Sequence, residues 1–365
     1  MKILLVGGGS GGPVAPLLAV AEKIKLHHVQ AEFLLVGTRS GPERLMAEEA
    51  NLPFVAISAG KWRRYFSLKN LLTPFQLAAG CWQAWKLMKR FRPDCMFGAG
   101  SFVQVPVAWV AWLLGVPVVL HQQDFQPSLA NRLCQVPARK ITVTFEQSLS
   151  DFASGWGLFY KKSKAPKIVW TGNPSRFNLR GLKREEGLKA FGLRNDLPTL
   201  LVLGGGTGAG FLNQLIVRCL PELSRVVQII HSTGPGKSAA PAQPDYHPYE
   251  FIKQAELAYA AADIVLCRAG MSTITELSNL QKVSIIVPMP DSHQEQNALF
   301  LLRRQAALVV PQSALDEHFL VRIIRKLLFD PKTQALFRQN ITGIMPKQAA
   351  EKIAEIIETL AISHA

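Results

Sequence analysis

The segments Val6-Gly-Gly-Gly-Ser-Gly-Gly12 and Leu203-Gly-Gly-Gly-Thr-Gly-Ala209 decide the fold, because each follows a short apolar run and is followed by a segment of helical length. The first segment fits the pattern G-x-G-x-x-G and the second fits G-x-G-x-x-A. Glycine lets the backbone approach a phosphate that a side chain would block, and the helix that follows stabilises the charge of the phosphate. Because the order of apolar run, glycine-rich turn and helical segment occurs twice, we predict two Rossmann-like domains.

Short apolar runs recur along both halves of the chain, with segments of helical length between many of them. Continuous apolar strands that alternate with helices indicate parallel sheets covered on both faces. We therefore expect an α/β protein with strands at residues 3–6, 33–36, 116–120, 141–145, 168–170, 200–203, 226–230, 264–266 and 283–287.

Glycine and proline punctuate the chain between the two halves. The segment Thr171-Gly-Asn-Pro-Ser175 interrupts the strand pattern, which predicts a first domain over residues 1–170 and a second over residues 171–345. Residues 234–248 are rich in Pro, Gly and Ala and are predicted to form a loop. A helix over residues 348–360 closes the chain, and we expect residues 346–365 to pack back on the first domain.

The composition predicts an anionic partner. The 365 residues include 41 Lys and Arg but only 26 Asp and Glu, a formal net charge of +15. Nucleic acid, an acidic membrane surface or a phosphorylated substrate would each fit this charge, and nucleic acid ranks last because no nucleic-acid module is visible. The 5 cysteines are scattered, which favours a reducing cytosol and suggests neither disulfides nor a zinc site. No apolar run reaches the ~20 residues of a membrane span, so any membrane contact is expected at the surface.

Residues 61–90 combine cations with aromatic residues and contain no acidic residue. The segment Thr73-Pro-Phe-Gln76 predicts the start of a helix over residues 74–91, with Thr73 as its N-cap. An apolar, tryptophan-bearing side flanked by Lys and Arg is typical of a helix that lies among lipid headgroups. The alternative is that the tryptophans are core residues and the cations form a solvated face. The predicted membrane contacts are Trp62, Phe66, Phe75, Trp82 and Trp85.

The segment Cys267-Arg-Ala-Gly-Met-Ser-Thr-Ile-Thr-Glu276 joins a predicted strand to a predicted helix. Free N–H groups at the start of the helix, together with its dipole, favour an anion such as a phosphate. Glu276 lies about one turn further on, where its carboxylate can accept hydrogen bonds from ribose hydroxyls. The alternative is that Ser272 or Thr273 only caps the helix and that Glu276 only favours its first turn.

Further motifs follow one another in a fixed order: Gly8–Pro16, Gly98–Val103, Gly115–Asp124, Thr171–Arg176, Gly204–Asn213, Glu250–Ile252, Cys267–Glu276 and His293–Ala298. Together they resemble the MurG family of peptidoglycan N-acetylglucosaminyltransferases. The resemblance implies the GT-B fold, in which two Rossmann-like domains face each other across a cleft. It also implies inverting transfer of N-acetylglucosamine from UDP-GlcNAc to undecaprenyl-linked N-acetylmuramyl-pentapeptide diphosphate, the step from lipid I to lipid II, by a peripheral protein on the cytoplasmic face of the cell membrane.

The resemblance assigns the second domain to the donor. Phe251 and Ile252 would meet the uracil, Glu276 the ribose, and Gln294 with Asn297 the sugar. The diphosphate and the start of the helix would be contacted through Arg176, Gly205, Gly206, Thr207, Arg268, Gly270, Met271, Ser272, Thr273, Ile274 and Thr275. UDP-GlcNAc is then a substrate, and the resemblance implies no cofactor and assigns no metal ligand.

The resemblance assigns the first domain to the acceptor, and the residues at the acceptor or its diphosphate would be Ser10, Gly11, Gly12, Asp124 and Asn131. The family has a histidine, a candidate base, where this chain has Pro13. The family's His-Glu-Gln-Asn appears here as His121-Gln-Gln-Asp124, and the serine of its second turn as Gly206. We expect Asp124 to supply or relay the base function, with His121 and then His293 as fallback candidates.

Three other functions remain open at this point. A related transferase acting on another lipid acceptor would have much the same donor half. An NADP-dependent oxidoreductase would use Arg39, at the end of the second predicted strand, for a 2′-phosphate. A protein that binds UDP-sugar without transferring it would explain the missing histidine at Pro13.

Overall fold

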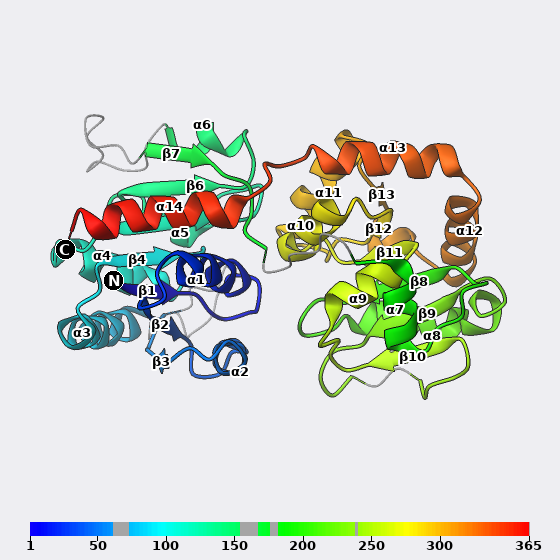
Figure 1. Ribbon diagram of the computed structural model, residues 1–365, viewed down its shortest axis with the longest axis horizontal. Helices are drawn as coiled ribbons and strands as arrows, with labels where there is room; N and C mark the ends of the chain where they lie inside the picture. Colours follow the sequence, from blue (N-terminus) through cyan, green and yellow to red (C-terminus); the bar gives the residue numbers. More distant parts are fainter. Residues whose placement is uncertain (61–72, 154–166, 176–181, 238–239, 365) are drawn as a thin grey trace. The chain divides into compact units, whose positions relative to one another are not determined.

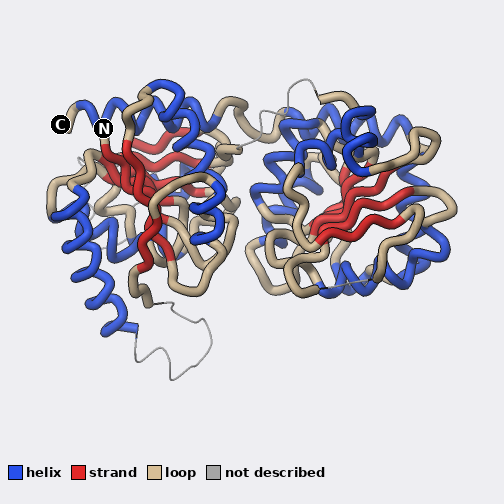
Figure 2. The backbone as a smooth tube through the Cα atoms, turned by 60° about the horizontal axis from the view of Figure 1, so that its bottom comes forward, coloured by secondary structure: helices blue, strands red, loops and turns tan. Residues whose placement is uncertain are grey.

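The computed structural model describes residues 1–60, 73–153, 167–175, 182–237 and 240–364. The chain divides into two compact units, the first made of residues 1–176 with 345–365 and the second of residues 177–344. Each unit is built around one sheet with helices on both of its faces (Figure 1, Figure 2). The division lies close to the boundary predicted at residue 170, and the C-terminal segment returns to the first unit.

The first unit contains a 7-stranded sheet in the order β3-β2-β1-β4-β5-β6-β7, with every neighbouring pair parallel. Its strands are β1 (Lys2–Val6), β2 (Glu32–Gly37), β3 (Phe54–Ala56), β4 (Cys95–Gly98), β5 (Val118–Gln122), β6 (Lys140–Val143) and β7 (Lys167–Trp170). Its helices among the described residues are α1 (Ala15–His27), α2 (Glu43–Glu49), α3 (Thr73–Phe91), α4 (Gln104–Leu113), α5 (Leu129–Leu133), α6 (Ser148–Ala153) and α14 (Ala349–Ile362).

Side chains along β1 alternate between the two faces of this sheet, as a strand with a period of two requires. Ile3 and Leu5 join a buried cluster with α1 and α14, whereas Leu4 and Val6 join a second cluster with α3 and α4. Both faces of the sheet are therefore covered, which explains why its strands read as continuous apolar runs. An ion pair between Lys23 of α1 and Glu351 of α14, 2.6 Å long, adds to the packing of the C-terminal helix on this unit.

The second unit contains a 6-stranded parallel sheet in the order β10-β9-β8-β11-β12-β13. Its strands are β8 (Thr199–Leu203), β9 (Gln228–Ser232), β10 (Tyr246–Tyr249), β11 (Ile264–Cys267), β12 (Ser284–Ile286) and β13 (Leu308–Val309). Its helices are α7 (Arg184–Phe191), α8 (Gly210–Leu223), α9 (Ala255–Ala261), α10 (Met271–Leu280), α11 (Gln294–Arg303), the short 3-10 helix η3 (Gln312–Ala314), α12 (Glu317–Leu328) and α13 (Pro331–Thr342).

Every strand predicted from the sequence is present, with ends that differ by a few residues. Strands β3, β4, β10 and β13 were not predicted, because they are short or, in β10, contain a proline. The prediction of a loop over 234–248 is wrong at its end, since β10 begins at Tyr246 on the edge of the sheet, where a proline is tolerated. The predicted helices over 74–91 and 348–360 correspond to α3 and α14.

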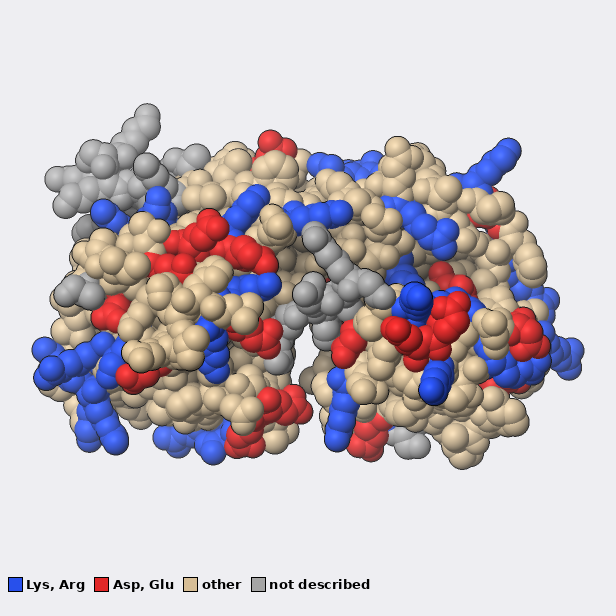
Figure 3. All heavy atoms as spheres, in the orientation of Figure 1, with Lys and Arg blue, Asp and Glu red and all other residues tan. Residues whose placement is uncertain are grey.

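On the face that Figure 3 shows, the positive charge is dispersed. Lys and Arg side chains are spread over the visible face of both units and are interrupted by acidic residues (Figure 3). Among the described helices, none combines the length and the apolar composition of a membrane span. The described residues also contain no group of three His, Cys, Asp or Glu side chains that could hold a metal ion.

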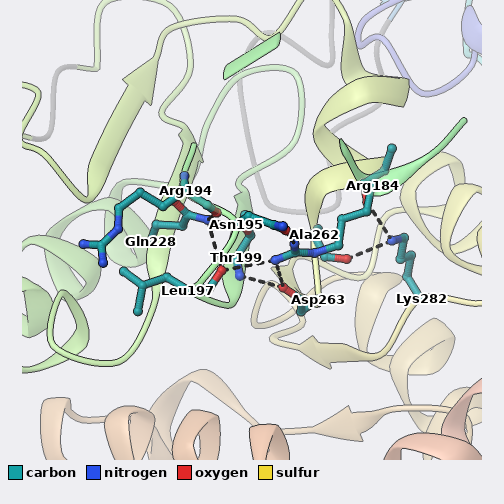
Figure 4. Close-up of polar contacts among 10 residues, drawn as sticks. Arg184, Arg194, Asn195, Leu197, Thr199, Gln228, Ala262, Asp263 and Lys282 are labelled. Atoms are coloured by element: carbon teal, nitrogen blue, oxygen red, sulfur yellow. Dashed lines mark hydrogen bonds and ion pairs between the residues drawn. The ribbon is translucent and has the colours of Figure 1, made fainter. Parts of the chain in front are cut away.

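A closed polar cluster lies at the amino end of the second sheet (Figure 4). Asp263, just before β11, accepts hydrogen bonds from the Thr199 N–H at 2.7 Å and from Arg184 Nη2 at 3.2 Å. Gln228 Nε2 donates to the Leu197 carbonyl at 3.1 Å, and Lys282 Nζ donates to the Ala262 carbonyl at 2.8 Å. Burial lowers the pKa of Lys282 to about 8. These groups bind one another, so a ligand site is expected at the opposite, carboxyl end of the strands.

Candidate functional site

The loops that leave the carboxyl ends of β8, β9, β10, β11 and β12 lie along one edge of the second sheet, because all its strands are parallel. They contain the second glycine turn (residues 204–209), the segments 233–237 and 250–252, the start of α10, and residues 287–293. The sequence singled out three of these five segments for a nucleotide-sugar: the glycine turn, residues 250–252 and the start of α10. The fold thus brings to one edge residues that lie far apart in the chain.

The second glycine turn crosses the segment that follows β9, and the two backbones are in close contact there. Gly208 has φ +70°, and a side chain there would overlap the carbonyl oxygen of Thr233. Gly234 has φ +92°, and its added Cβ would lie 2.5 Å from the Cα of Gly208. By contrast, Gly205 and Gly206 are exposed, and an added Cβ at either would meet no described atom. One side of the turn is therefore fixed by contact and the other side is open to a ligand.

A buried polar network supports the same crossing. Asn213 of α8 donates from Nδ2 to the Thr233 carbonyl at 2.9 Å, and its Oδ1 lies 3.1 Å from His231 Nε2. The other ring nitrogen of His231 lies 2.9 Å from the hydroxyl of Tyr246. Burial lowers the pKa of His231 to about 4, so the ring is neutral near pH 7. This network was not predicted from the sequence. A histidine in a strand and an asparagine in a helix, both at core positions, could have indicated it, because buried polar groups are normally paired.

Helix α10 begins without a capping side chain. Its N-cap is Gly270, and no side chain of the described residues accepts from the first turn, so the alternative that Ser272 or Thr273 caps the helix is wrong. The Ile274 N–H bonds to the Gly270 carbonyl at 3.0 Å, which leaves the three preceding N–H groups for another acceptor. The side chains of Met271, Ile274 and Thr275 are buried. Any ligand contact from these three positions must come from the backbone.

Glu276 lies one turn into α10, with Oε2 2.6 Å from the hydroxyl of Tyr259. Burial of the carboxyl group raises the pKa of Glu276 to about 7, and the hydrogen bond from Tyr259 lowers it in part. Oε1 has no hydrogen-bond partner among the described residues. The site therefore presents one carboxylate oxygen to a ligand. Tyr259 was not predicted, since nothing in the pattern of α9 distinguishes it from a core tyrosine.

Other predicted donor residues differ in what their side chains can offer. The ring of Phe251 is 54% exposed, whereas Ile252 is buried. Gln294 is half-buried, and its Oε1 accepts from the Met289 N–H at 3.1 Å. The side chain of Asn297 is buried and donates to the Ala269 carbonyl at 3.1 Å, so it supports the loop before α10 from inside the unit.

Arg268 is used within the second unit. Its Nη1 donates to the carbonyls of Val287 and Pro288, and its Nη2 donates to Gln312 at 2.7 Å. Thr207 is exposed beside the open glycines of the turn. Arg176, predicted at the diphosphate, lies outside the described residues.

The first glycine turn is filled by a side chain that the sequence analysis did not consider. The carboxylate of Glu43, at the start of α2, accepts hydrogen bonds from the Gly9 N–H at 2.8 Å and from the Thr38 N–H at 2.9 Å. Glu43 is completely buried, and its Oε2 has no partner among the described residues. An added Cβ would collide with the side chain of Glu43 at any of three glycines: Gly8, Gly37 and Gly41.

This arrangement bears on the oxidoreductase alternative. A dinucleotide in a Rossmann-like domain places its ribose at the end of the second strand, next to the glycine turn. Here Glu43 occupies that place, bonded to both the turn and the end of β2. Glu43 therefore takes up the N–H groups of Gly9 and Thr38 from inside the unit, and these two groups are not offered to a dinucleotide in the described structure.

The predicted acceptor residues lie at the carboxyl end of the first sheet. Ser10 and Gly12 are exposed and Gly11 is half-buried, and Gln123 Nε2 donates to the Gly12 carbonyl at 3.0 Å. This bond brings the segment after β5 next to the glycine turn. Asp124, half-buried in that segment, thus lies one residue from a direct contact with the turn.

Two predicted residues of the first unit are engaged inside it. His121 is buried, and its ring nitrogens lie 2.9 Å from Thr142 Oγ1 and 2.9 Å from Asn173 Oδ1. Burial lowers the pKa of His121 to about 4, so it is a poor base near pH 7. Asn131 is also buried, with its amide bonded to Gln104, Gln122 and the His121 carbonyl. Neither side chain is available to a substrate in the described structure.

The aromatic residues of α3 lie at the surface. Phe75 is 75% exposed, Trp82 61% and Trp85 48%, so the alternative that the tryptophans are core residues is wrong. The core side of α3 is formed by other residues, including Ala84 and Met88. Trp62 and Phe66 lie outside the described residues.

Family models match both halves of the chain. The glycosyltransferase family 28 N-terminal domain matches residues 3–143, and the glycosyltransferase family 28 C-terminal domain matches residues 199–360. These ranges contain the first and the second glycine turn, respectively.

Curated relatives match the chain over nearly its whole length. The UDP-N-acetylglucosamine--N-acetylmuramyl-(pentapeptide) pyrophosphoryl-undecaprenol N-acetylglucosamine transferase of Clostridium kluyveri is 34% identical over 365 residues, with 98% of this chain and 99% of the relative covered. The protein of the same name from Bacillus licheniformis is 32% identical, with 99% of each chain covered.

Solved structures share the architecture. The crystal structure of Acinetobacter baumannii MurG superposes with a TM-score of 0.71 at 24% identity, covering 98% of this chain and 99% of that chain. The calicheamicin glycosyltransferase CalG4 superposes with a TM-score of 0.70 at 15% identity, covering 98% of each chain. The prediction of two Rossmann-like domains of the GT-B type is confirmed.

Proposed function

The chain belongs to glycosyltransferase family 28, and from this premise we propose that it transfers N-acetylglucosamine from UDP-GlcNAc to lipid-linked N-acetylmuramyl-pentapeptide diphosphate, converting lipid I to lipid II in peptidoglycan synthesis. The relatives that match over the full length carry this activity in their names. One observation on the chain itself carries the proposal. An open glycine turn, an uncapped helix start and a single available carboxylate oxygen lie along one sheet edge of the second unit.

Each part of this edge suits one part of the donor. The N–H groups at the start of α10 and the open side of Gly205 and Gly206 suit the diphosphate, because both offer donors without a side chain in the way. Glu276 suits the ribose hydroxyls, which donate to a carboxylate. The exposed ring of Phe251 suits the flat face of uracil. Arg176, by the family resemblance, adds a cation at the diphosphate.

The reaction we propose inverts the anomeric centre. An acceptor hydroxyl oxygen forms a bond to the anomeric carbon while the bond from that carbon to the UDP oxygen breaks, and UDP leaves with the electron pair. Helix-end N–H groups stabilise the charge that develops on the diphosphate, a contribution that is usually large because the donors are fixed in advance. This stabilisation needs no cofactor, so we expect turnover to persist in the presence of a metal chelator.

We propose Asp124 as the group that takes the proton of the attacking hydroxyl, directly or through a relay. It is half-buried next to the first glycine turn, where Pro13 offers no basic atom. His121 is not used, since its ring is buried and bonded on both sides. Replacing Asp124 by Asn should reduce kcat by roughly 10²–10⁴-fold while the Kd for UDP-GlcNAc stays unchanged. Unchanged turnover of the variant would remove Asp124 from this role.

We further propose that α3 contacts the cytoplasmic face of the membrane. Phe75, Trp82 and Trp85 are exposed beside Lys86, whose Nζ lies 5.5 Å from the ring centre of Trp82. Neighbouring helices add exposed apolar side chains: Trp112, Leu113, Leu129 and Leu133. Apolar residues flanked by cations fit an anionic lipid surface, and the lipid-linked acceptor requires such a contact. A Trp82→Ala, Trp85→Ala double variant should bind anionic vesicles about 10-fold more weakly than the wild type, as measured by sedimentation with the vesicles.

The decisive experiment for this function is a transfer assay. The purified chain is incubated with labelled UDP-GlcNAc and a short-chain lipid-linked muramyl-pentapeptide acceptor, and both UDP release and the disaccharide product are measured. The proposal predicts equal amounts of the two. Donor binding without product on this acceptor, but with product on another lipid acceptor, would replace the acceptor in the proposal. Failure to bind UDP-GlcNAc would overturn it.

A further inference from the structure

A buried tyrosine stands behind the proposed ribose contact. Tyr259 of α9 is 1% exposed, and its hydroxyl donates to Glu276 Oε2 at 2.6 Å. A buried hydroxyl requires a hydrogen-bond partner, and among the described residues Glu276 is the partner of this one. Since α9 and α10 flank β11, this bond ties two helices together at the position of the carboxylate. The carboxyl group of Glu276 is thereby fixed by one of its two oxygens.

Of the three neighbouring groups Tyr259, Cys267 and Glu276, only Glu276 changes its protonation near neutral pH. Burial raises the pKa of Tyr259 well above its ordinary value, and the nearby Glu276 raises it further. Burial also raises the pKa of the thiol of Cys267, on β11, with a further contribution from Glu276. Both groups stay protonated near neutral pH, whereas the pKa of Glu276 is raised to about 7. The Tyr259 hydroxyl acts against that rise, because it donates to the ionised carboxylate.

We propose that Tyr259 is a positioning residue for the sugar-nucleotide donor: its hydroxyl holds Glu276 Oε2 so that Oε1 is presented, ionised, to the ribose hydroxyls. The inference rests on the proposed function, because it requires a ribonucleotide at this edge. It goes further in assigning the selectivity for ribose to a pair of residues. The geometry supports it, since Oε2 is bonded and Oε1 has no described partner.

Removing the hydroxyl has two consequences that loss of packing alone would not produce. A Tyr259→Phe variant keeps the buried ring but frees the carboxyl group to rotate, so a ribose and a deoxyribose should be bound more equally. The same variant loses the donor that favours the ionised carboxylate, so the pKa of Glu276 rises further. Binding that needs the ionised form then requires a higher pH.

Another tyrosine of the same unit provides a matched control. Tyr246 is completely buried and its hydroxyl is bonded to His231 at 2.9 Å, not to Glu276. Tyr246→Phe removes the same atom from an equally buried ring. It should cost a comparable amount of stability and leave the selectivity for ribose unchanged.

The test measures binding of UDP-GlcNAc and of its 2′-deoxyribose analogue by calorimetry, between pH 5.5 and pH 8.5. Both ligands keep a constant diphosphate charge over this range, so a change with pH reports on the protein. We expect the wild type to prefer the ribose by about 10-fold, with an affinity that falls as the pH drops through about 7. Tyr259→Phe should reduce the preference to about 3-fold and move the pH midpoint upward.

The outcomes separate this inference from the proposed function. A folded Tyr259→Phe protein with wild-type selectivity and pH midpoint would overturn the positioning role and leave the donor site intact. An equal loss of selectivity in Tyr246→Phe would also overturn it, since the effect would then be one of general packing. A wild-type chain that binds neither ligand would contradict the proposed function itself.

Discussion

The two glycine turns are nearly identical in sequence and differ in what stands next to them. Residues 7–12 and residues 204–209 both follow a central strand of a parallel sheet and both lead into a helix. At the first turn, the carboxylate of Glu43 accepts the Gly9 N–H from inside the unit. At the second turn, the partners lie behind the backbone, and the face at Gly205 and Gly206 is open.

Because the two turns share a sequence pattern but differ in their surroundings, the glycine pattern specifies a backbone path and not a ligand. At the first turn the Gly9 N–H is bonded to Glu43 and is not offered to a ligand, so we expect this turn to contribute less to donor binding than the second turn. At the second turn the backbone crossing with Thr233 shapes the loop and leaves the face at Gly205 and Gly206 open. Each of the following changes tests one side of this contrast.

The largest effect is expected from Gly208→Ala. The position has φ +70°, and the added methyl group would overlap the Thr233 carbonyl, which is backbone and cannot rotate away. We expect a loss of more than about 4 kcal/mol in the free energy of unfolding of the second unit, measured by denaturant titration. Gly206→Ala is the control, because its Cβ meets no described atom. A Gly208→Ala protein as stable as this control would show that the crossing does not hold the turn.

The next largest effect is expected from Glu43→Ala, at the first turn. The variant empties the space of a completely buried side chain and leaves the N–H groups of Gly9 and Thr38 without their acceptor, which should cost about 2–4 kcal/mol of stability. Glu43→Gln keeps an acceptor oxygen and should cost less than half as much. Both variants should bind UDP-GlcNAc with wild-type affinity in calorimetry at a temperature where they are folded. A specific loss of donor binding would contradict the assignment of the two turns.

The next effect, which is smaller for each pH unit, is expected from acid. The pKa of His231, about 4 in the folded protein, lies below its ordinary value of 6.5, so the unfolded chain takes up this proton first as the pH falls. The stability contributed by the neutral ring is fully present above pH 6.5 and is lost as the pH drops through about 4, at roughly 1.4 kcal/mol for each pH unit between them. A His231→Gln variant should show a correspondingly shallower dependence of Tm on pH. An unaltered dependence would mean that His231 is not held neutral.

The smallest effect is expected from Lys237→Ala. Its Nζ donates to the Gly208 carbonyl at 3.2 Å on the exposed side of the second turn. Loss of one exposed hydrogen bond should weaken UDP-GlcNAc binding by about 3-fold and leave Tm within about 1 °C of wild type. Lys189→Ala, at an exposed position of α7, provides the control and should change neither quantity.

The sequence was sufficient for the architecture because buried parallel strands are continuous apolar runs that need no long-range information. It also placed the start of α10, since Gly270 and the run to Glu276 lie within one local segment, but it left open whether Ser272 or Thr273 caps the helix. Strands β4 and β10 were missed because β4 contains no β-branched residue and β10 contains Pro248. Their place is set by pairing with neighbours that are distant in the chain.

The supports of the site were not predictable for the same physical reason. Glu43 reaches a turn that lies 34 residues earlier, and Tyr259 reaches a carboxylate 17 residues later. A buried glutamate and a surface glutamate look alike in a sequence. The same holds for Asn131 and His121, which were predicted to meet substrate and are bonded inside the first unit. The type of each residue suggested what its side chain could bind, whereas its burial decided whether that side chain is available to a substrate.

The central claim is that the donor binds at the second turn and not at the first. Hydrogen–deuterium exchange of the full chain, with and without UDP-GlcNAc, tests this claim most directly because it reads backbone N–H groups along both turns in one experiment. We expect slower exchange in peptides that cover residues 204–210 and 270–276 when UDP-GlcNAc is bound. Slower exchange confined to residues 7–12, with the second turn and the start of α10 unchanged, would contradict it.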